Sequence, residues 1–286
     1  LAVLMHEYWP EIEPGSILIV PSLTAIASAE QRRSEIPSRT LAMIADPVYA
    51  LSDPRLSDGT SNAAQTFPTQ STRDIRVSGG LQRIPATGKE AQTIIAIVGQ
   101  SQDTLALTGL DASRHRVTSA PLDQYRIVHF ATHAVADDLD TALSSLALSR
   151  WNSQWQPIDG DLRLYDITQM RLNADLVVLS GCETAVGKEI AGEGPIGLSQ
   201  AFLRAGAHSV IASLWRVPDS STAYLMKEFY RQLLMERRRA AAALLIAQEA
   251  VRHKKRWSDP YYWAGFQLVS VTPTGRINNN VARRRE

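Results

Sequence analysis

The chain has 286 residues with a formal net charge of +1, and 44% of its residues are hydrophobic while 21% are charged. This composition is typical of a folded globular protein, and the near-neutral charge gives no reason to expect direct contact with nucleic acid. It contains no signal-peptide pattern and no apolar run long enough to cross a membrane, and its single cysteine suits a reducing compartment, so we expect a cytoplasmic location.

The first half of the chain alternates predicted strands with predicted helices. Residues 47–87 are rich in Ser, Thr, Asp, Pro and Gly, and we expect them to form a surface insertion, disordered in part. The helix that follows is predicted to begin with a capping box of Thr87 and Glu90. Strands are predicted at 16–20, 40–46 and 105–107, and helices at 23–33, 87–98 and 111–120.

The second half continues the same alternation. Strands are predicted at 127–131, 143–149, 176–179 and 209–215, with a last strand within 261–269, and helices at 161–170, 195–206, 221–235 and 240–251. We expect the strand at 143–149 to lie at a sheet edge. Such alternation favours an α/β fold with a mostly parallel sheet covered on both faces. We expect one domain over residues 1–272, a disordered basic tail over 273–286, and a missing region upstream of Leu1.

Two predicted strands end beside residues that carry chemistry. The apolar run Leu176–Leu179 closes with Ser180-Gly181, and Cys182, the only cysteine, follows. The run Ile127–Ala131 is followed by His133. Active sites of parallel sheets lie at the carboxyl ends of strands, so we expect neighbouring strands to bring Cys182 and His133 together. A thiol needs a nearby base to form the attacking thiolate, and histidine titrates in the right range.

These residues also have ordinary structural interpretations. A lone cysteine is most often a small buried hydrophobic side chain, and spacing alone leaves that alternative open. The position of Cys182 just past Ser180-Gly181, rather than within the apolar run, favours the nucleophile. His129 lies inside its strand and is expected to be a core histidine satisfied by hydrogen bonds. Surface or capping positions are expected for His6, His115, His208 and His253.

The sequence favours neither a metal site nor a nucleotide site. One cysteine and scattered histidines lack the close spacing of zinc ligands, so we expect no metal and no cofactor. Gly192–Gly197 matches G-x-G-x-x-G, but the preceding strand lies roughly a dozen residues away instead of directly before it. Pro195 removes a backbone donor and Glu193 adds negative charge where a pyrophosphate would bind. A tight turn is the expected role of these glycines, and a nucleotide-binding module is the weaker alternative.

Several motifs, in a fixed order, resemble the CHAT domain family. His-Phe-Ala-Thr-His-Ala at 129–134 and Asp-Leu-Val-Val-Leu-Ser-Gly-Cys-Glu-Thr at 175–184 surround the predicted site. The other segments that carry the resemblance are 20–22, 83–90, 143–149, 192–207, 210–215 and 260–266. The resemblance as a whole spans roughly residues 10–271.

This resemblance implies a fold and a reaction. The fold would be a caspase-like three-layer α/β sandwich, with a mostly parallel central sheet and helices on both faces. The reaction would be that of a cysteine endopeptidase with His133 as general base and Cys182 as nucleophile, and no third catalytic residue is implied. The oxyanion hole would use the backbone N–H groups of Cys182 and Ala134. Relatives often have glycine after the histidine, so Ala134 must reach a suitable conformation without glycine's freedom.

The resemblance also suggests which residues meet the substrate. In caspase-like relatives, the residue two before the cysteine and the loop after the next strand line the first specificity pocket. The candidates here are Ser180, Trp215, Arg216 and Asp219, with Glu183 as a further acidic candidate. Trp215 is interpreted equally well as a pocket wall or as the end of a core strand. Asp219 is better placed to cap the next helix than to select a basic side chain.

Partners follow from the same resemblance. Family members often lie downstream of tetratricopeptide repeats, so we expect regulation by an upstream repeat region or an activating partner. The expected substrate is a protein or peptide, and no membrane is expected to be involved. An alternative of a different class is a catalytically silent scaffold with the same fold that binds a partner protein.

Overall fold

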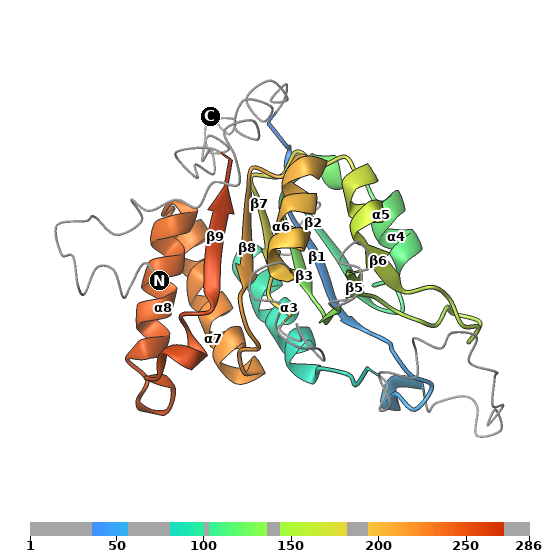
Figure 1. Cartoon of the computed structure of the whole chain (residues 1–286), viewed down its shortest axis with the longest axis horizontal. Coiled ribbons are helices and arrows are strands. Elements are labelled where there is room, and N and C mark those ends of the chain that lie inside the picture. Colours follow the sequence, from blue (N-terminus) through green and yellow to red (C-terminus); the bar gives the residue numbers. More distant parts are fainter. Residues whose placement is uncertain (1–35, 57–80, 100–102, 136–143, 182–193, 272–286) are drawn as a thin grey trace.

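A six-stranded sheet forms the centre of the protein (Figure 1). The structure, a computed structural model, describes residues 36–56, 81–99, 103–135, 144–181 and 194–271. The strands lie in the order β2-β1-β3-β7-β8-β9, and neighbours are parallel except β8 and β9, which are antiparallel. Their bounds are β1 Arg39–Pro47, β2 Thr104–Gly109, β3 Tyr125–Ala131, β7 Leu176–Leu179, β8 Ser209–Ser213 and β9 Phe266–Ser270. This confirms the predicted mostly parallel sheet.

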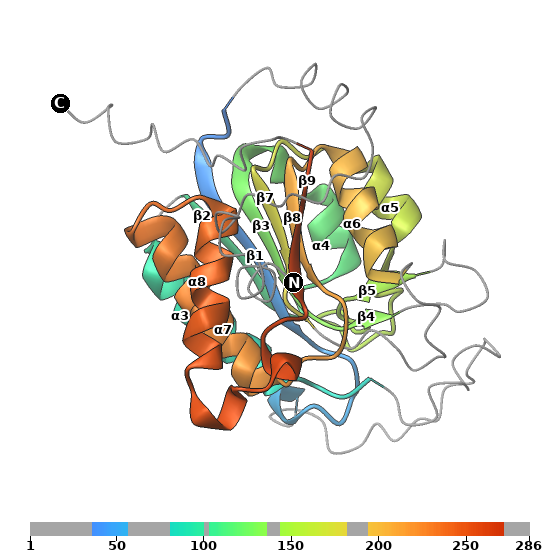
Figure 2. The ribbon, with the colours of Figure 1, turned by 60° about the vertical axis from the view of Figure 1, so that its left-hand side comes forward.

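Helices cover both faces of the sheet, which gives three layers (Figure 2). Helices α3, α7 and α8 pack on one face, and α4, α5 and α6 pack on the other. The helix bounds are α3 Pro85–Val98, α4 Arg114–Ser119, α5 Leu164–Gln169, α6 Gly194–Ala205, α7 Asp219–Tyr230 and α8 Ala240–Arg252. A π-helical turn, Arg231–Met235, continues α7, and short 3-10 turns lie at Pro54–Leu56, Leu122–Gln124, Lys255–Trp257 and Pro260–Tyr262.

The continuous apolar runs of the central strands follow from these two covered faces. In β3, Ile127 and Ala131 belong to the hydrophobic cluster beneath α3, α7 and α8. Val128 and Phe130 point to the opposite cluster, beneath α4 and α6. Since successive side chains of a strand alternate between faces, a strand buried on both sides needs apolar residues at nearly every position.

A second, smaller sheet corrects two of the predictions. Strands β4 Ala134–Val135, β5 Ser145–Ala147 and β6 Asp161–Arg163 form an antiparallel sheet with β5 in the middle. The strand predicted at 143–149 is therefore not at an edge, and the helix predicted from residue 161 begins only at Leu164. A short apolar run shows that a strand is present but does not identify the strands it pairs with.

The start of α3 corrects the predicted capping box. The helix begins at Pro85, where the missing N–H of proline is tolerated, and the Thr87 hydroxyl donates to the Ile84 carbonyl at 2.8 Å. Glu90 consequently falls in the second turn and is buried, with 4% of its surface exposed. The spacing of Thr87 and Glu90 thus reflects a buried acidic residue and not a cap.

The segment predicted as a surface insertion, residues 47–87, is described at its two ends only. Val48 and Tyr49 are buried, so the first end packs against the body of the domain instead of lying on its surface. The other end leads into α3. The predicted strand at 16–20, the helix at 23–33 and the tail from residue 273 lie outside the described residues.

Of two C-terminal predictions, one is confirmed and one needs correction. The segment 261–269 holds the last strand, which begins at Phe266 after a 3-10 turn at Pro260–Tyr262 that the Asp259 side chain caps. His208, expected at the surface, is buried, and its Nδ1 lies 3.1 Å from the Ala174 carbonyl. Among the described helices, none is long and apolar enough to span a membrane.

Candidate active site

The strands that precede His133 and Cys182 are neighbours. Strands β3 and β7 pair in parallel from Ile127 opposite Leu176 to Phe130 opposite Leu179. The pairing continues one step further, because the Ser180 N–H donates to the Phe130 carbonyl at 3.0 Å. Both carboxyl ends therefore lie at the same rim of the sheet, as the sequence predicted.

Gly181, the last described residue before Cys182, makes a close contact at this rim. A Cβ atom added to Gly181 would lie 1.4 Å from the carbonyl oxygen of Thr132 and 2.7 Å from its backbone nitrogen. Only glycine, which has no Cβ, allows the two backbones to approach this closely. The residue before Cys182 thus lies against the residue before His133. Cys182 and Glu183 are themselves outside the described residues.

The His133 ring is held by the backbone of a distant segment. It is 1% exposed, and Nε2 lies 2.7 Å from the carbonyl oxygen of Gln82. Because a carbonyl oxygen only accepts, this contact assigns the proton to Nε2. In the neutral ring Nδ1 is then the nitrogen that can accept a proton, as a general base must.

Tyr49 completes the surroundings of His133 and was not identified from the sequence. Its ring centre is 5.1 Å from that of His133. Its hydroxyl lies 2.7 Å from Thr132 Oγ1 and accepts from the backbone N–H of His133 at 3.5 Å. Burial raises the pKa of Tyr49, so this hydroxyl stays protonated. The sequence signal that could have identified Tyr49 is its position two residues after the end of β1, the strand that pairs with β3.

His129 is a core histidine, as predicted. It is fully buried, with Nδ1 2.8 Å from the Tyr230 hydroxyl and Nε2 2.8 Å from Ser180 Oγ. Glu90 Oε1 lies 3.0 Å from the same Nε2, outside the geometry of a hydrogen bond. Burial, together with the nearby Glu90, raises the pKa of Tyr230. We call His129, Glu90, Ser180 and Tyr230 the buried network.

Ala134, expected to supply an oxyanion donor, lies in β4 opposite Leu146. The adjacent ladder bond runs from the Ala147 N–H to the His133 carbonyl at 2.9 Å. In an antiparallel ladder, this pattern makes Ala134 and Leu146 a pair that does not exchange hydrogen bonds. The Ala134 N–H consequently points away from β5 and is not used in the small sheet.

The candidate substrate residues differ in exposure. The Ser180 side chain is buried and bonded to His129, below the rim. Trp215 follows β8, packs partly against the core and donates from Nε1 to the Tyr261 carbonyl at 2.9 Å. Arg216 is exposed. Asp219 is exposed at the first position of α7, whose N-cap residue is Pro218, so Asp219 itself is not the N-cap.

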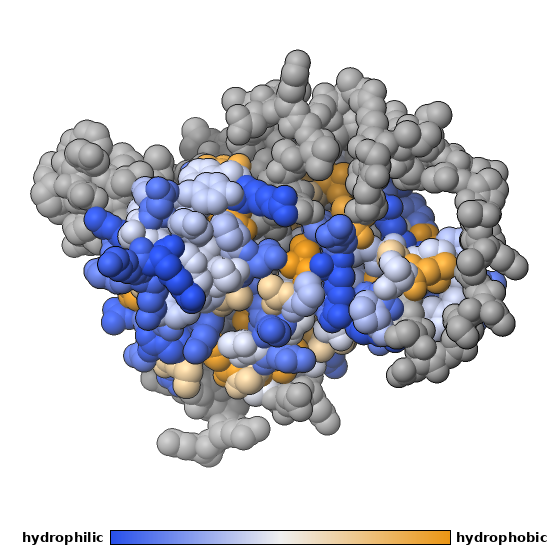
Figure 3. All heavy atoms as spheres, turned by 90° about the horizontal axis from the view of Figure 1, so that it is seen from below, coloured by the Kyte–Doolittle hydropathy of each residue, from blue (hydrophilic) through white to orange (hydrophobic). Residues whose placement is uncertain are grey.

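The rim has a mixed surface. Figure 3 views the protein from below, onto the carboxyl ends of the parallel strands, and shows hydrophobic groups set among hydrophilic ones. The exposed basic residues Lys254, Lys255 and Arg256 follow the end of α8. In the described ranges, no group of three histidine, cysteine, aspartate or glutamate side chains is arranged to hold a metal ion.

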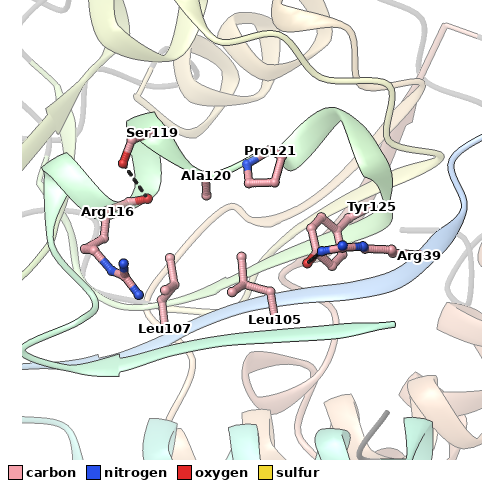
Figure 4. A pocket seen from close by; sticks show the side chains of 8 residues that line it. All are labelled: Arg39, Leu105, Leu107, Arg116, Ser119, Ala120, Pro121 and Tyr125. Carbon is pink, nitrogen blue, oxygen red and sulfur yellow. Dashed lines mark hydrogen bonds between the residues drawn. The ribbon is translucent and has the colours of Figure 1, made fainter. Parts of the chain in front are cut away.

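A small cavity of about 210 Å³ opens away from this rim (Figure 4). It lies between β2 and the end of α4, and Arg39 and Tyr125, the first residues of β1 and β3, line one side. Arg39 donates to the Tyr125 hydroxyl at 2.8 Å. Since these residues begin their strands, the cavity is at the opposite end of the sheet from His133.

Comparisons with known proteins agree with this architecture. A family model described as the CHAT domain matches residues 6–271. The chain is 31% identical to tetratricopeptide repeat protein 28 of Mus musculus over 221 residues and to that of Homo sapiens over 220 residues. Each alignment covers 65% of this chain and 8% of the relative, so the chain corresponds to a small part of those proteins.

A solved structure has the same fold. Saccharomyces cerevisiae separase, in its complex with securin, superposes with a TM-score of 0.51 at 14% identity, over 89% of this chain and 14% of that one. Identity at this level indicates a shared architecture only. From the match over residues 6–271 and this architecture, the chain belongs to the CHAT domain family and has its caspase-like α/β fold.

Proposed function

We propose that this chain is a cysteine endopeptidase that uses Cys182 as nucleophile and His133 as general base. The observation that carries the proposal is the contact of Gly181 with the Thr132 backbone at the ends of two paired parallel strands. One trans peptide separates consecutive Cα atoms by about 3.8 Å. Cys182 is the residue after Gly181, and His133 is the residue after Thr132. Each is therefore one peptide away from this contact at the rim.

The orientation of His133 supports its role as the base. With Nε2 donating to the Gln82 carbonyl, Nδ1 is the acceptor for the Cys182 thiol proton. The backbone carbonyl also stabilises the ring once it becomes positively charged, because it accepts a stronger hydrogen bond from a cation. Thiol activation by an oriented imidazole is a general route to a reactive thiolate.

The reaction then proceeds in two halves. Proton transfer from the Cys182 sulfur to His133 gives the thiolate, which attacks the peptide carbonyl carbon. The tetrahedral intermediate collapses as the C–N bond breaks, and His133 returns its proton to the leaving amine. Water, deprotonated by His133, attacks the resulting thioester, and the carboxylic acid leaves as the Cys182 thiol is restored.

Backbone donors are proposed to stabilise the oxyanion in both halves. The Ala134 N–H, directed away from β5, and the N–H of Cys182 are the two donors. Neither needs a side chain, so alanine at position 134 does not remove the donor. Preorganised backbone donors of this kind supply a large part of catalysis in acyl transfer.

We further propose that the substrate is a protein or peptide that lies along the rim past Trp215, Arg216 and Asp219. Glu183 and Ser180 remain proposals for this groove, Ser180 through its backbone because its side chain is buried. The name of the murine and human relatives mentions tetratricopeptide repeats, which supports regulation by an upstream repeat region. We place this activity in the cytoplasm, since the chain has a single cysteine.

The single cysteine makes the test direct. The rate of alkylation by iodoacetamide or a peptide chloromethylketone is compared in wild type, His133→Ala and the control His115→Ala, which changes an exposed histidine. We expect His133→Ala to slow labelling about tenfold or more, because it removes the base, while His115→Ala leaves it unchanged. A Cys182→Ala variant gives the background.

The alternative is distinguished in the same assay. A catalytically silent scaffold predicts slow labelling in wild type and no effect of His133→Ala. A peptide library is then incubated with wild type and with Cys182→Ala. Cleavage by wild type alone supports the peptidase, and no cleavage by either supports the scaffold.

A further inference from the structure

Asp46 joins the two ends of the segment that separates β1 from α3. The Arg55 side chain lies 3.0 Å from Asp46 Oδ2 and also donates to the Asp46 carbonyl at 2.9 Å. From the other end, Arg83 binds the same carboxylate. Arg55 and Arg83 therefore meet at one acidic side chain at the carboxyl end of β1, next to β3.

The contact with Arg83 is the more geometrically defined of the two. Arg83 Nε donates to Asp46 Oδ1 at 2.9 Å and Nη2 donates to Oδ2 at 2.7 Å, a bidentate pair. The Asp46 side chain is 10% exposed and that of Arg83 is 31% exposed. Asp46 has φ of 50°, a left-handed conformation that aspartate and asparagine tolerate better than most residues.

This pair is connected to His133 through one peptide group. The carbonyl that accepts the His133 Nε2 proton belongs to Gln82, and it shares a peptide plane with the nitrogen of Arg83. Because that plane is rigid, an Arg83 side chain fixed on Asp46 restricts the direction of the Gln82 carbonyl. The direction of the carbonyl in turn sets the orientation of the imidazole.

We propose that Asp46 and Arg83 are positioning residues for His133, acting through the Gln82 carbonyl. Their role is to hold the neutral ring as the Nε2–H tautomer, with Nδ1 directed toward the rim. The catalytic meaning of this arrangement rests on the proposed function of His133 as base. In this proposal neither side chain contacts the substrate or the reacting atoms, and their effect is on the orientation and tautomer of His133.

The chain offers a matched control pair. Arg114 donates to Asp166 from Nε at 3.0 Å and from Nη2 at 2.7 Å, and the two side chains are 35% and 11% exposed. In both pairs the hydrogen-bonded carboxylate raises the pKa of the arginine. The control pair joins α4 to α5 and has no hydrogen bond with Gln82 or His133. Arg114→Gln thus removes a bidentate ion pair of the same geometry from a different place, together with a contact to Asp159 at 3.3 Å.

The experiment compares Arg83→Gln, Arg83→Lys and Asp46→Asn with Arg114→Gln in the full chain. Asp46→Asn keeps a residue that accepts positive φ while it removes the charge. Nitrogen-15 NMR of the imidazole rings reports the tautomer of His133, assigned by its absence from His133→Ala. The alkylation rate of Cys182 and the thermal midpoint are measured in parallel.

We expect Arg83→Gln and Asp46→Asn to convert the His133 signal into a mixture of tautomers and to slow alkylation about tenfold. Arg83→Lys keeps the charge but only one of the two hydrogen bonds to Asp46. Its tautomer mixture and alkylation rate should therefore lie between those of Arg83→Gln and wild type. Arg114→Gln should lower the thermal midpoint about as much as Arg83→Gln does, while the His133 tautomer and the alkylation rate of Cys182 stay as in wild type.

Two results separate the proposals. An Nε2–H signal that is unchanged in both Arg83→Gln and Asp46→Asn overturns the positioning role, whatever happens to alkylation. If the tautomer changes as expected but wild type and His133→Ala react with the probe equally fast, the positioning role stands and the proposed peptidase chemistry fails.

Discussion

His129 and His133 lie four residues apart, one within β3 and one just beyond it, and their surroundings differ. His129 is enclosed by side chains: the Tyr230 hydroxyl at Nδ1, and the Ser180 hydroxyl and the Glu90 carboxylate at Nε2. His133 has its Nε2 on a backbone carbonyl, that of Gln82. Both rings are buried, with 0% and 1% of their surface exposed.

The difference separates a structural histidine from a candidate base. Both nitrogens of His129 have fixed partners, so this ring can exchange a proton with a substrate only by breaking its own bonds. For His133 the backbone partner fixes one nitrogen and defines the other as the acceptor. Burial and a ring nitrogen near the rim are therefore not enough to identify a catalytic histidine, and the partners of each nitrogen must be known.

The largest expected effect comes from replacing the two histidines by leucine in turn. His129→Leu leaves the buried Tyr230 and Ser180 hydroxyls without the imidazole that bonds them, which we expect to cost about 3–4 kcal/mol of unfolding free energy. His133→Leu removes the hydrogen bond to the Gln82 carbonyl and should cost about 1 kcal/mol while abolishing rapid alkylation of Cys182. Urea denaturation followed by tryptophan fluorescence measures both, and equal losses of stability would contradict the comparison.

Part of this comparison was accessible from the sequence. The position of His129 within an apolar strand predicted a core role, and the matching apolar runs before His133 and Cys182 predicted that their strands are neighbours. Those inferences succeed because a strand buried on both faces must be apolar throughout, which is a property of the local sequence.

The partners of the two histidines were not accessible. Glu90 has the spacing of a capping box, and only the tertiary fold shows that it faces His129, 39 positions away. Tyr49 and Gln82 lie in a segment without periodicity. Gln82 acts through its carbonyl, which every residue has, so no residue type marks the position. The three-stranded sheet was missed because its strands are two or three residues long.

The next largest effect is expected from Gly181→Ala, which disturbs the rim next to both histidines. The added Cβ would overlap the Thr132 carbonyl, a backbone atom that no side-chain rotation can move away. We expect the free energy of unfolding to fall by about 3 kcal/mol, at the upper end of the range for overpacking, and the alkylation rate of Cys182 to fall as well. Gly197→Ala, where the added Cβ meets only a side-chain atom at 3.8 Å, is the control. Wild-type stability and labelling in Gly181→Ala would show that the close contact is not required.

A smaller effect is expected where the buried network meets the rim. Ser180→Ala removes the hydroxyl at His129 Nε2 and should cost about 1 kcal/mol. Ser209→Ala is a matched control, because the buried Ser209 hydroxyl donates to Ser270 at 2.9 Å on a different strand. If the buried network helps to position the chain after Ser180, alkylation of Cys182 slows in Ser180→Ala and not in Ser209→Ala. Equal alkylation rates in the two variants would mean that the buried network contributes to stability only.

The smallest effect concerns the tyrosine beside each histidine. Burial raises the pKa of both Tyr49 and Tyr230 above the ordinary value of 10.0, so the unfolded chain loses these protons at lower pH than the folded one. Their contribution to stability is complete below pH 10 and falls as the pH rises above it. Tyr49→Phe and Tyr230→Phe, which cannot ionise, should each flatten this alkaline decline in urea denaturation between pH 9 and pH 11. If the alkaline decline in stability is unchanged in both variants, other groups control it. If only Tyr230→Phe changes the decline, the Tyr49 hydroxyl ionises as readily in the folded chain as in the unfolded one.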